Sequence, residues 1–184
     1  MLALPHIAPL AAYAARLRTC PGVEVPDFDP LDGGIEARIL FLLEKPGPMT
    51  APSRPGRQGS GFISRDNDDA TAAATHRFML EAGLPRTDTV IWNLIPWWNG
   101  TIAITAGERV AGARELQNLL ALLPRLRTTV LVGRTAARAR PLLNSLRVLE
   151  SAHPSPQVRA GYRTLWDAIP GVWRQAANAG SALC

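Results

Sequence analysis

The sequence is poor in the residue types that build metal centres and in the long apolar runs that cross membranes. Its 184 residues include two cysteines and three histidines, too few for a disulfide framework, a four-thiolate zinc site or a four-thiolate iron–sulfur cluster. No apolar run approaches the roughly 18 to 20 residues of a membrane span, and residues 1–9 lack the basic start of a secretory signal. We therefore expect a cytoplasmic chain, not bound to a membrane, with neither a metal nor another cofactor.

Three common catalytic and nucleotide-binding motifs are also missing. The chain has no G-x-S-x-G nucleophile elbow, no G-x-x-x-x-G-K-[ST] phosphate loop and no G-x-G-x-x-G after an apolar run. These absences argue against serine hydrolases of that type, P-loop nucleotide hydrolases and dinucleotide-binding enzymes.

Lysine is almost absent, although the chain is basic. Of 20 basic residues, 19 are arginine and only Lys45 is lysine; with 15 acidic residues the net charge is +5. Arginine binds phosphate bidentately, and a moderately basic domain is compatible with a nucleic-acid partner. A compositional bias that also enriches alanine and proline explains the same numbers, so charge alone leaves both interpretations open.

The residues that are present suffice for a folded core. Apolar residues make up 47% of the chain, and its length fits one domain, which we expect to span residues 1–184. Apolar periodicity, caps and breakers predict strands over 37–43, 89–95, 128–132 and 146–150. They predict helices over 6–18, 68–82 (capped by residue 66, 67 or 68), 107–123 (with Val110 on its apolar face), 135–143 and 155–177 (broken near Pro170), and loops over 21–34 and 44–61.

Strands that alternate with helices predict an α/β sandwich with a mostly parallel sheet. Ligands of such sheets bind beyond the carboxyl ends of the strands. This rule selects four segments as candidate sites: 44–48, 93–100, 133–134 and 153–156.

Each of these segments offers a functional and a structural interpretation. Glu44 is a carboxylate at a strand end, before a loop rich in proline and glycine. The amide of Asn93 lies in an apolar strand and must find hydrogen bonds, either with the edge of a nucleobase or with a neighbouring loop. His153 can be a catalyst or a satisfied structural histidine. Ser155 can cap the last helix and present its hydroxyl to a phosphate.

The four segments together resemble the uracil-DNA glycosylase superfamily. The segment 39–48, ILFLLEKPGP, is similar to the first motif of the branch that reads Gly-Glu-Ala-Pro-Gly, with a leucine in place of the first glycine and Lys45 in place of the alanine. Segment 89–99 resembles the strand that delivers a base-reading asparagine, and 131–133 a loop near the DNA backbone. Residues 153–156, HPSP, match the final motif. The resemblance covers roughly residues 37–166.

The resemblance implies a fold, an activity and a partner. The fold is a three-layer α/β/α sandwich around a four-stranded, mostly parallel sheet. The activity is that of a monofunctional DNA glycosylase, which cleaves the N-glycosidic bond of uracil in base excision repair. The partner is DNA, single- or double-stranded, with the target base flipped out of the stack. The chain would act as a monomer, associated with the nucleoid.

The resemblance also implies site residues. In this family the carboxylate stabilises the oxocarbenium-like sugar or orients water, and the histidine donates to the departing base. The expected roles are catalysis by Glu44 and His153; base binding by Asn93, Phe62 (stacking) and Lys45; contacts to the DNA backbone by Pro46, Gly47, Pro48, Gly133 and Ser155; and intercalation by Gln157, Val158 and Arg159. Lys45 can instead be a nucleophile that forms a Schiff base with the sugar.

Departures from the family pattern keep alternatives open. The Gly-Glu-Ala-Pro-Gly branch usually carries a four-cysteine iron–sulfur cluster, which two cysteines cannot supply. Lys45 occupies a position where other branches place an aspartate or asparagine that positions water. The alternatives are a glycosylase for another deaminated, damaged or modified base, a catalytically silent DNA-binding member of the fold, and an unrelated small-molecule α/β enzyme. Likewise, Trp97 and Trp98 can be packing residues or a stacking surface.

Overall fold

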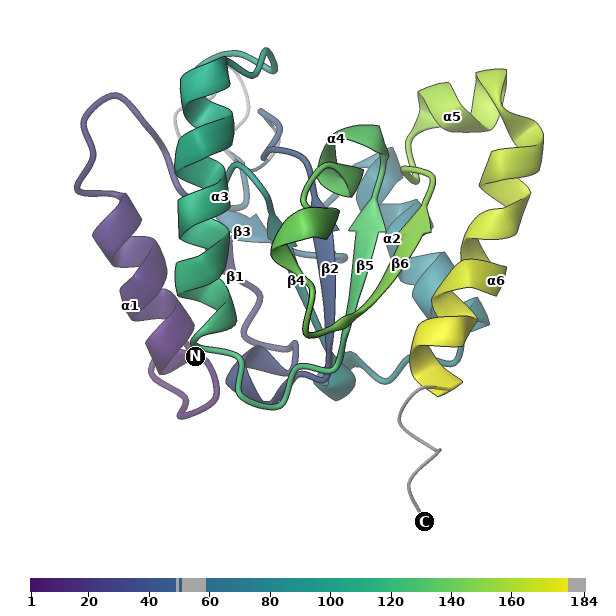
Figure 1. Ribbon diagram of the computed structural model, residues 1–184, viewed down its shortest axis with the longest axis horizontal. Coiled ribbons are helices and arrows are strands. Elements are labelled where there is room, and N and C mark those ends of the chain that lie inside the picture. The colour runs from purple at the N-terminus through teal and green to yellow at the C-terminus, as the bar shows by residue number, and fades with distance from the viewer. Residues whose placement is uncertain (49, 51–58, 179–184) are drawn as a thin grey trace.

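The structure, a computed structural model, describes residues 1–48, 50 and 59–178 (Figure 1). Its helices and strands, in chain order, are α1 (Ala8–Leu17), β1 (Asp27–Phe28), β2 (Ile39–Leu43), β3 (Phe62–Ile63), α2 (Ala70–Glu81), β4 (Thr89–Asn93), α3 (Ala106–Leu120), β5 (Thr128–Val132), α4 (Arg134–Ala137), β6 (Arg147–Ser151), α5 (Pro156–Gly161) and α6 (Arg163–Asn178). Short 3₁₀ turns lie at Gly34–Glu36, Arg86–Asp88 and Arg140–Leu142.

A four-stranded parallel sheet forms the middle layer, in the order β4-β2-β5-β6. Strands β4 and β5 are buried along their whole length, and β2 is buried except at its last residue. Their continuous apolar sequences reflect this burial on both faces. Helices α2 and α6 pack together on one side of the sheet, and α1 and α3 lie on the other (Figure 1). The predicted three-layer α/β sandwich is confirmed.

The order of the strands sets the position of the functional edge. The chain enters the sheet at β2, adds β4 on one side, and then crosses over to add β5 and β6 on the other. All four carboxyl ends therefore lie at one edge, the upper edge in Figure 1. The reversal of direction around β2 opens a crevice at that edge, where ligands of open α/β sheets bind. Strands β1 and β3 form a separate two-stranded parallel sheet.

Aromatic side chains fill the core on both sides of the sheet. Phe28 and Trp92 stack with ring centroids 3.6 Å apart. On the α6 side, Phe41 meets Trp173 edge to face at 4.8 Å. Because each large ring buries about 150 to 250 Å², these contacts between distant parts of the chain account for much of the fold's stability.

The C-terminal helix is divided at a different residue from the one predicted. The break falls at Tyr162, whose φ of −141° and ψ of 59° end α5 just after Gly161, whereas Pro170 lies inside α6. A proline costs a helix one backbone hydrogen bond. The buried Trp166 and Trp173 anchor α6 on both sides of Pro170, so packing holds the helix together there.

Other boundaries also differ from the prediction. The cap of α2 is Asp69, whose side chain accepts bonds from the N–H groups of Thr71 and Ala72, each 2.9 Å long. Val110, predicted on the buried face of α3, is 74% exposed because the first turns of α3 extend past the sheet edge (Figure 1). Pro141 converts the end of the expected helix 135–143 into a 3₁₀ turn.

The two predicted loops have different outcomes. The segment 21–34 contains the short strand β1. Of the segment 44–61, residues 49 and 51–58 lie outside the described residues. No helix in the described ranges is both long and apolar enough to cross a membrane.

Candidate active site

Four residues from four loops meet at the carboxyl edge of the sheet. Glu44 directly follows β2, Asn93 ends β4, Gly133 follows β5, and His153 comes two residues after β6. The ladder holds these ends in register, because the Glu44 carbonyl accepts a bond from the Ile95 N–H at 2.9 Å and the Gly133 N–H donates to the Ser151 carbonyl at 2.9 Å. The four predicted segments therefore come together.

One cavity at this edge, the polar pocket, has a volume of about 520 Å³. Its walls come from the loop after β2, the start of α2, the end of β4 and residues 153, 156 and 157. Its polar lining includes Asn67, Asp69, Thr75, Asn93 and His153. A concave site of this size with a few convergent polar groups is typical of small-ligand binding.

Asn93 is a buried polar side chain of this pocket that the described part of the fold leaves without a partner. It is 4% exposed, and its amide has no hydrogen-bond partner among the residues that the structure describes. An unpaired buried amide costs about 1 to 3 kcal/mol. The alternative role as a loop anchor thus has no hydrogen bond to support it within that part of the chain, and the amide is free to pair with a ligand.

His153 lines the polar pocket and also a second cavity on its other side. Gly133 packs against it with φ of +90°, and a Cβ at that glycine would lie 3.3 Å from the Cβ of His153. Burial lowers the pKa of His153 from its usual value near 6.5, although the negative charges of Glu44 and Asp69 oppose the change. The imidazole is therefore mostly neutral at pH 7, and one ring nitrogen carries a proton that it can donate.

This lowered pKa predicts a pH-dependent stability. Because the unfolded histidine binds a proton below about pH 6.5 and the folded one resists it, folding is favoured above that pH and weakened as the pH falls. Wild type should therefore lose more thermal stability between pH 7.5 and 5 than His153→Asn. The exposed His76 provides the control, His76→Asn, which should follow wild type. If wild type and His153→Asn lost the same thermal stability over this pH range, the prediction that the folded His153 is neutral would be wrong.

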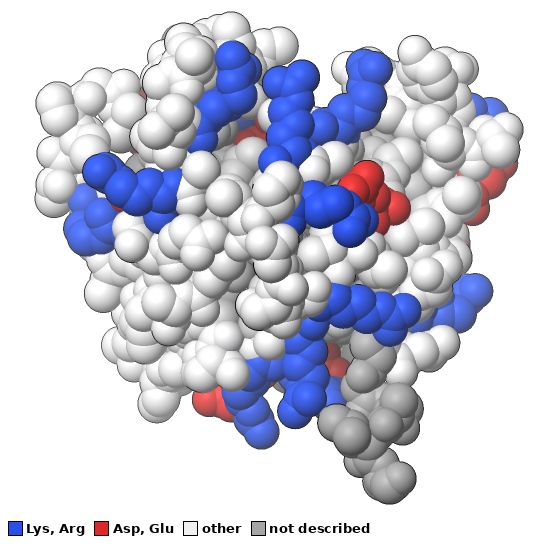
Figure 2. Space-filling model, viewed as in Figure 1, with Lys and Arg blue, Asp and Glu red and all other residues white. Residues whose placement is uncertain are grey.

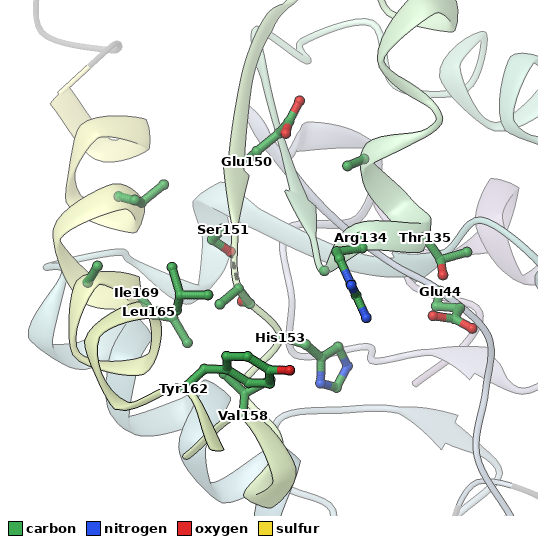
Figure 3. A pocket seen from close by; sticks show the side chains of 15 residues that line it. Glu44, Arg134, Thr135, Glu150, Ser151, His153, Val158, Tyr162, Leu165 and Ile169 are labelled. Atoms are coloured by element: carbon green, nitrogen blue, oxygen red, sulfur yellow. Dashed lines mark hydrogen bonds between the residues drawn. The ribbon is translucent and has the colours of Figure 1, made fainter. Parts of the chain in front are cut away.

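The second cavity, the apolar pocket, has a volume of about 550 Å³. Glu44, Gly133, Arg134 and His153 border it on the sheet side, and α5 and α6 form the opposite wall. Figure 3 shows the Glu44 carboxylate, the Arg134 guanidinium and the His153 ring directed into this space. Within the described residues, Glu44 has no ion-pair partner, so its charge is available to a ligand.

Lys45 lines the polar pocket, but its ammonium group is already bonded to other residues of the protein. Its side chain is 3% exposed, and the ammonium donates to Asn99 Oδ1 and Glu108 Oε1 at 2.8 Å and to the Ala103 carbonyl at 3.1 Å. All three protons are used by residues outside both pockets. This engagement also disfavours the Schiff-base alternative, which needs a free, neutral amine.

The partner of Lys45 organises the start of α3. Glu108 forms a capping box with Thr105 and accepts a bond from the Trp97 indole at 3.2 Å. Burial alone would raise the pKa of Glu108, but the bonds from Lys45, Thr105 and Trp97 outweigh burial and lower it to about 2. Trp97 is therefore a packing residue with a satisfied indole N–H.

Lys45→Met should destabilise the protein strongly. It leaves the nearly buried Glu108 carboxylate without its cation, and breaking a buried pair costs about 3 to 5 kcal/mol. A pair that depresses the Glu108 pKa contributes its full stability above the unfolded pKa near 4.5 and loses it as the pH falls towards 2. The difference in unfolding free energy between the variant and wild type should thus shrink over this pH range.

The control for Lys45→Met is Arg163→Met, which removes an exposed ion pair with Asp167. Pairs of that kind contribute about 0 to 1 kcal/mol. Urea titrations that give both variants the same small loss would show that the Lys45 contacts do not stabilise the fold.

Phe62 does not line the polar pocket. It lies half-buried in β3, and its neighbour Ile63 lines the pocket instead. Successive side chains of a strand point to opposite faces, so the expected stacking role is not supported by this geometry. The Phe62 carbonyl, however, accepts a bond from the Asn67 amide at 3.0 Å, which fixes the pocket wall.

The residues expected to contact the DNA backbone are divided between the cavities. Pro46, Gly47 and Pro48 line the polar pocket, and Gly133 borders the apolar pocket. Ser155 lines neither; its hydroxyl caps α5 by accepting a bond from the Val158 N–H at 3.4 Å. Ser155 therefore caps α5, and its contact with a DNA phosphate stays a prediction.

The expected intercalation loop is a helix. Gln157, Val158 and Arg159 lie in α5. Val158 is half-buried and faces the apolar pocket, and the Arg159 guanidinium lies 5.9 Å from the centroid of the Trp166 ring. The helix holds Val158 against the protein, so this side chain is not presented as a wedge.

Two exposed side chains at the apolar pocket, Tyr162 and Leu165, lie outside the segments selected from the sequence. Tyr162 and Leu165 are 62% and 56% exposed and line its outer wall, and the exposed Arg134 borders its inner side (Figure 3). Tyr162 and Leu165 follow the last motif, so no sequence signal marks them, whereas Arg134 belongs to the selected segment 133–134. Among the described residues, no group of three or more His, Cys, Asp or Glu is arranged to hold a metal ion.

Comparisons with known proteins place this geometry in a family. No relative is found among proteins with curated descriptions. One similar solved structure is the solution NMR structure of a protein from Methanosarcina acetivorans proposed to be a uracil DNA glycosylase; it is 16% identical, with a TM-score of 0.43, over 84% of this chain and 99% of that one. The family model of the uracil DNA glycosylase superfamily matches residues 31–174. The chain belongs to the uracil DNA glycosylase superfamily.

Proposed function

We propose that this protein is a monofunctional DNA glycosylase that hydrolyses the N-glycosidic bond of uracil in DNA. The observation that carries the proposal is the buried amide of Asn93, which faces the polar pocket without a partner among the described residues. A buried polar group is retained without a bond where a ligand completes it. Family membership supports glycosylase chemistry in general, and the pocket supports a flipped base as the ligand.

The amide suits uracil because it offers one donor direction and one acceptor. The Asn93 N–H₂ group would donate to O4 of uracil, and its carbonyl would accept from N3–H. Cytosine presents an amino donor and a bare ring nitrogen at the same places, so both contacts would oppose like groups. A site built this way rejects the wrong base, because its buried groups are left unpaired.

The two ionisable residues would act on the two fragments of the breaking bond. As the bond between C1′ and N1 of uracil lengthens, the sugar becomes an oxocarbenium-like cation and the base becomes an anion. The Glu44 carboxylate would stabilise the cation and orient the attacking water, while neutral His153 would donate a hydrogen bond to the base oxygen that gains charge. Water then adds to C1′, and its proton leaves to solvent or to the departing base.

The charge of the surface fits DNA as the partner. Figure 2 shows several basic side chains at the upper edge, over the loops that follow the sheet. Arg109, Arg134 and Arg159 are exposed on the helices at this edge. Basic residues around a cavity attract phosphates and add to affinity without reading sequence.

An excision assay tests the proposal. A labelled single-stranded oligonucleotide with one uracil is incubated with the protein and cleaved with alkali, and should yield a product at the uracil but none at a cytosine in the same position. A parallel panel carries hypoxanthine, xanthine or modified cytosines. Excision from the panel alone would show that the base assignment is wrong, and binding without any excision would identify a catalytically silent member.

A further inference from the structure

The proposed reaction leaves most of the apolar pocket unoccupied, because the sugar and the water reach only the side that Glu44 borders. Glu44 and His153 contact it only along one side, whereas α5 and α6 supply a wall of Val158, Tyr162, Leu165 and Ile169 (Figure 3). Tyr162 and Leu165 expose more than half of their surface to solvent. Large apolar side chains that stay exposed around a cavity of about 550 Å³ mark a binding site.

The charges of this pocket favour a ligand with one anionic group beside a neutral ring. Arg134 has no ion-pair partner in the described part of the chain. Glu150, on the same side of the cavity, is already paired with Arg140 at 2.6 Å. A free guanidinium binds a phosphate in a planar, bidentate manner, while an aromatic ring and aliphatic side chains accept the flat face of a heterocycle.

The apolar pocket is also continuous with the site of the proposed reaction, because the His153 ring separates it from the polar pocket and lines both. A base held against Asn93 on one side of His153 therefore places the next part of the strand at the other cavity. One phosphodiester links two neighbouring nucleotides, and Arg134 borders the apolar pocket on the same side as His153 (Figure 3).

We propose that the apolar pocket binds the base of the nucleotide next to the excised one, with Tyr162 and Leu165 against the ring and Arg134 on the intervening phosphate. This inference rests on the proposed function, and it adds a substrate class. Two adjacent bases then leave the stack together, which costs a few kcal/mol for each base in a duplex and least in a single strand. The preferred substrate is therefore single-stranded or locally opened DNA.

The test removes the neighbouring base rather than the uracil. Single-stranded oligonucleotides carry uracil with a stable abasic spacer immediately 5′ or 3′ to it. One of the two spacers should raise the KM for uracil excision about tenfold with wild type, since stacking of one base on an aromatic side chain contributes about 1 to 3 kcal/mol. In Leu165→Ala the same spacer should have a much smaller effect.

Each variant of the apolar pocket has a control that makes a similar change outside the pocket. Leu80→Ala removes a leucine from α2 that is even more exposed than Leu165, and this variant should keep the full spacer effect. Arg134→Gln should reduce the slope of log binding constant against log salt by about 0.7, the value for one phosphate in a single strand. Arg147→Gln, at the exposed amino end of β6, should leave that slope unchanged.

Fluorescence anisotropy measures the binding of the same oligonucleotides. The proposed function and the neighbouring-base site can then be tested independently of each other. Absence of uracil excision would contradict the proposed function, while anisotropy with and without the spacer still tests the pocket. A spacer effect that is absent on both sides, or equal in wild type and Leu165→Ala, would overturn the neighbouring-base site even if uracil is excised.

Discussion

Glu44→Gln is expected to slow uracil excision in a single turnover by roughly 100-fold to 1,000-fold, with little change in DNA binding. Glutamine keeps the size and the hydrogen-bonding oxygen of the side chain but removes its charge. Within the described residues this charge is unpaired, and it matters only while positive charge develops on the sugar. A group that acts mainly in the transition state affects the rate rather than the affinity.

The control for this substitution is Glu36→Gln, which makes the same chemical change at an exposed 3₁₀ turn just before β2, at the edge of the sheet opposite the site. Both variants are measured with excess protein over a labelled uracil oligonucleotide, and their affinities are compared by anisotropy. If Glu44→Gln excised uracil at nearly the wild-type rate, the proposed role of the Glu44 carboxylate would be wrong.

Asn93→Asp is expected to lower uracil excision and to raise the excision of cytosine to a detectable level. The aspartate has no donor for O4 of uracil, whereas one of its two acceptor oxygens matches the amino group of cytosine. The ratio of the two rates should therefore fall sharply. Single-stranded substrates suit this measurement because flipping costs little there.

Melting temperatures separate base reading from a general loss of structure. If Asn93 only supported the fold, the substitution would lower the excision rates of uracil and cytosine by the same factor. The ratio of the two rates would then not change. Asn144→Asp, at an exposed position before β6, makes the same change outside the site and should leave both the ratio and the melting temperature near wild type.

The amino-acid sequence is sufficient to locate the edge of the sheet where the site lies. Continuous apolar runs identify β2, β4 and β5, because a strand covered on both faces has no polar positions. Since parallel strands end at one edge, the polar residues that follow them, Glu44, Asn93 and His153, can be grouped from their positions in the chain alone. The family resemblance draws on the same segments, and the match over 31–174 confirms it.

The directions of individual side chains cannot be predicted in the same way. Phe62 and Ile63 differ by one position in a two-residue strand, and nothing in the local sequence decides which of them faces the cavity. The three partners of Lys45 come from 54 to 63 residues further along the chain, so its burial depends on tertiary packing. Likewise, Val158 is held by a helical turn whose extent is set by contacts with α6.

The burial of Lys45 makes the protein's amine chemistry unusually simple. A reagent that acylates primary amines meets a single lysine side chain in the whole sequence, and that amine is enclosed between the loop that carries Glu44 and the start of α3. Acylation at Lys45 therefore requires these two segments to separate. The rate of modification at Lys45 reports how often these two segments separate, without any engineered label.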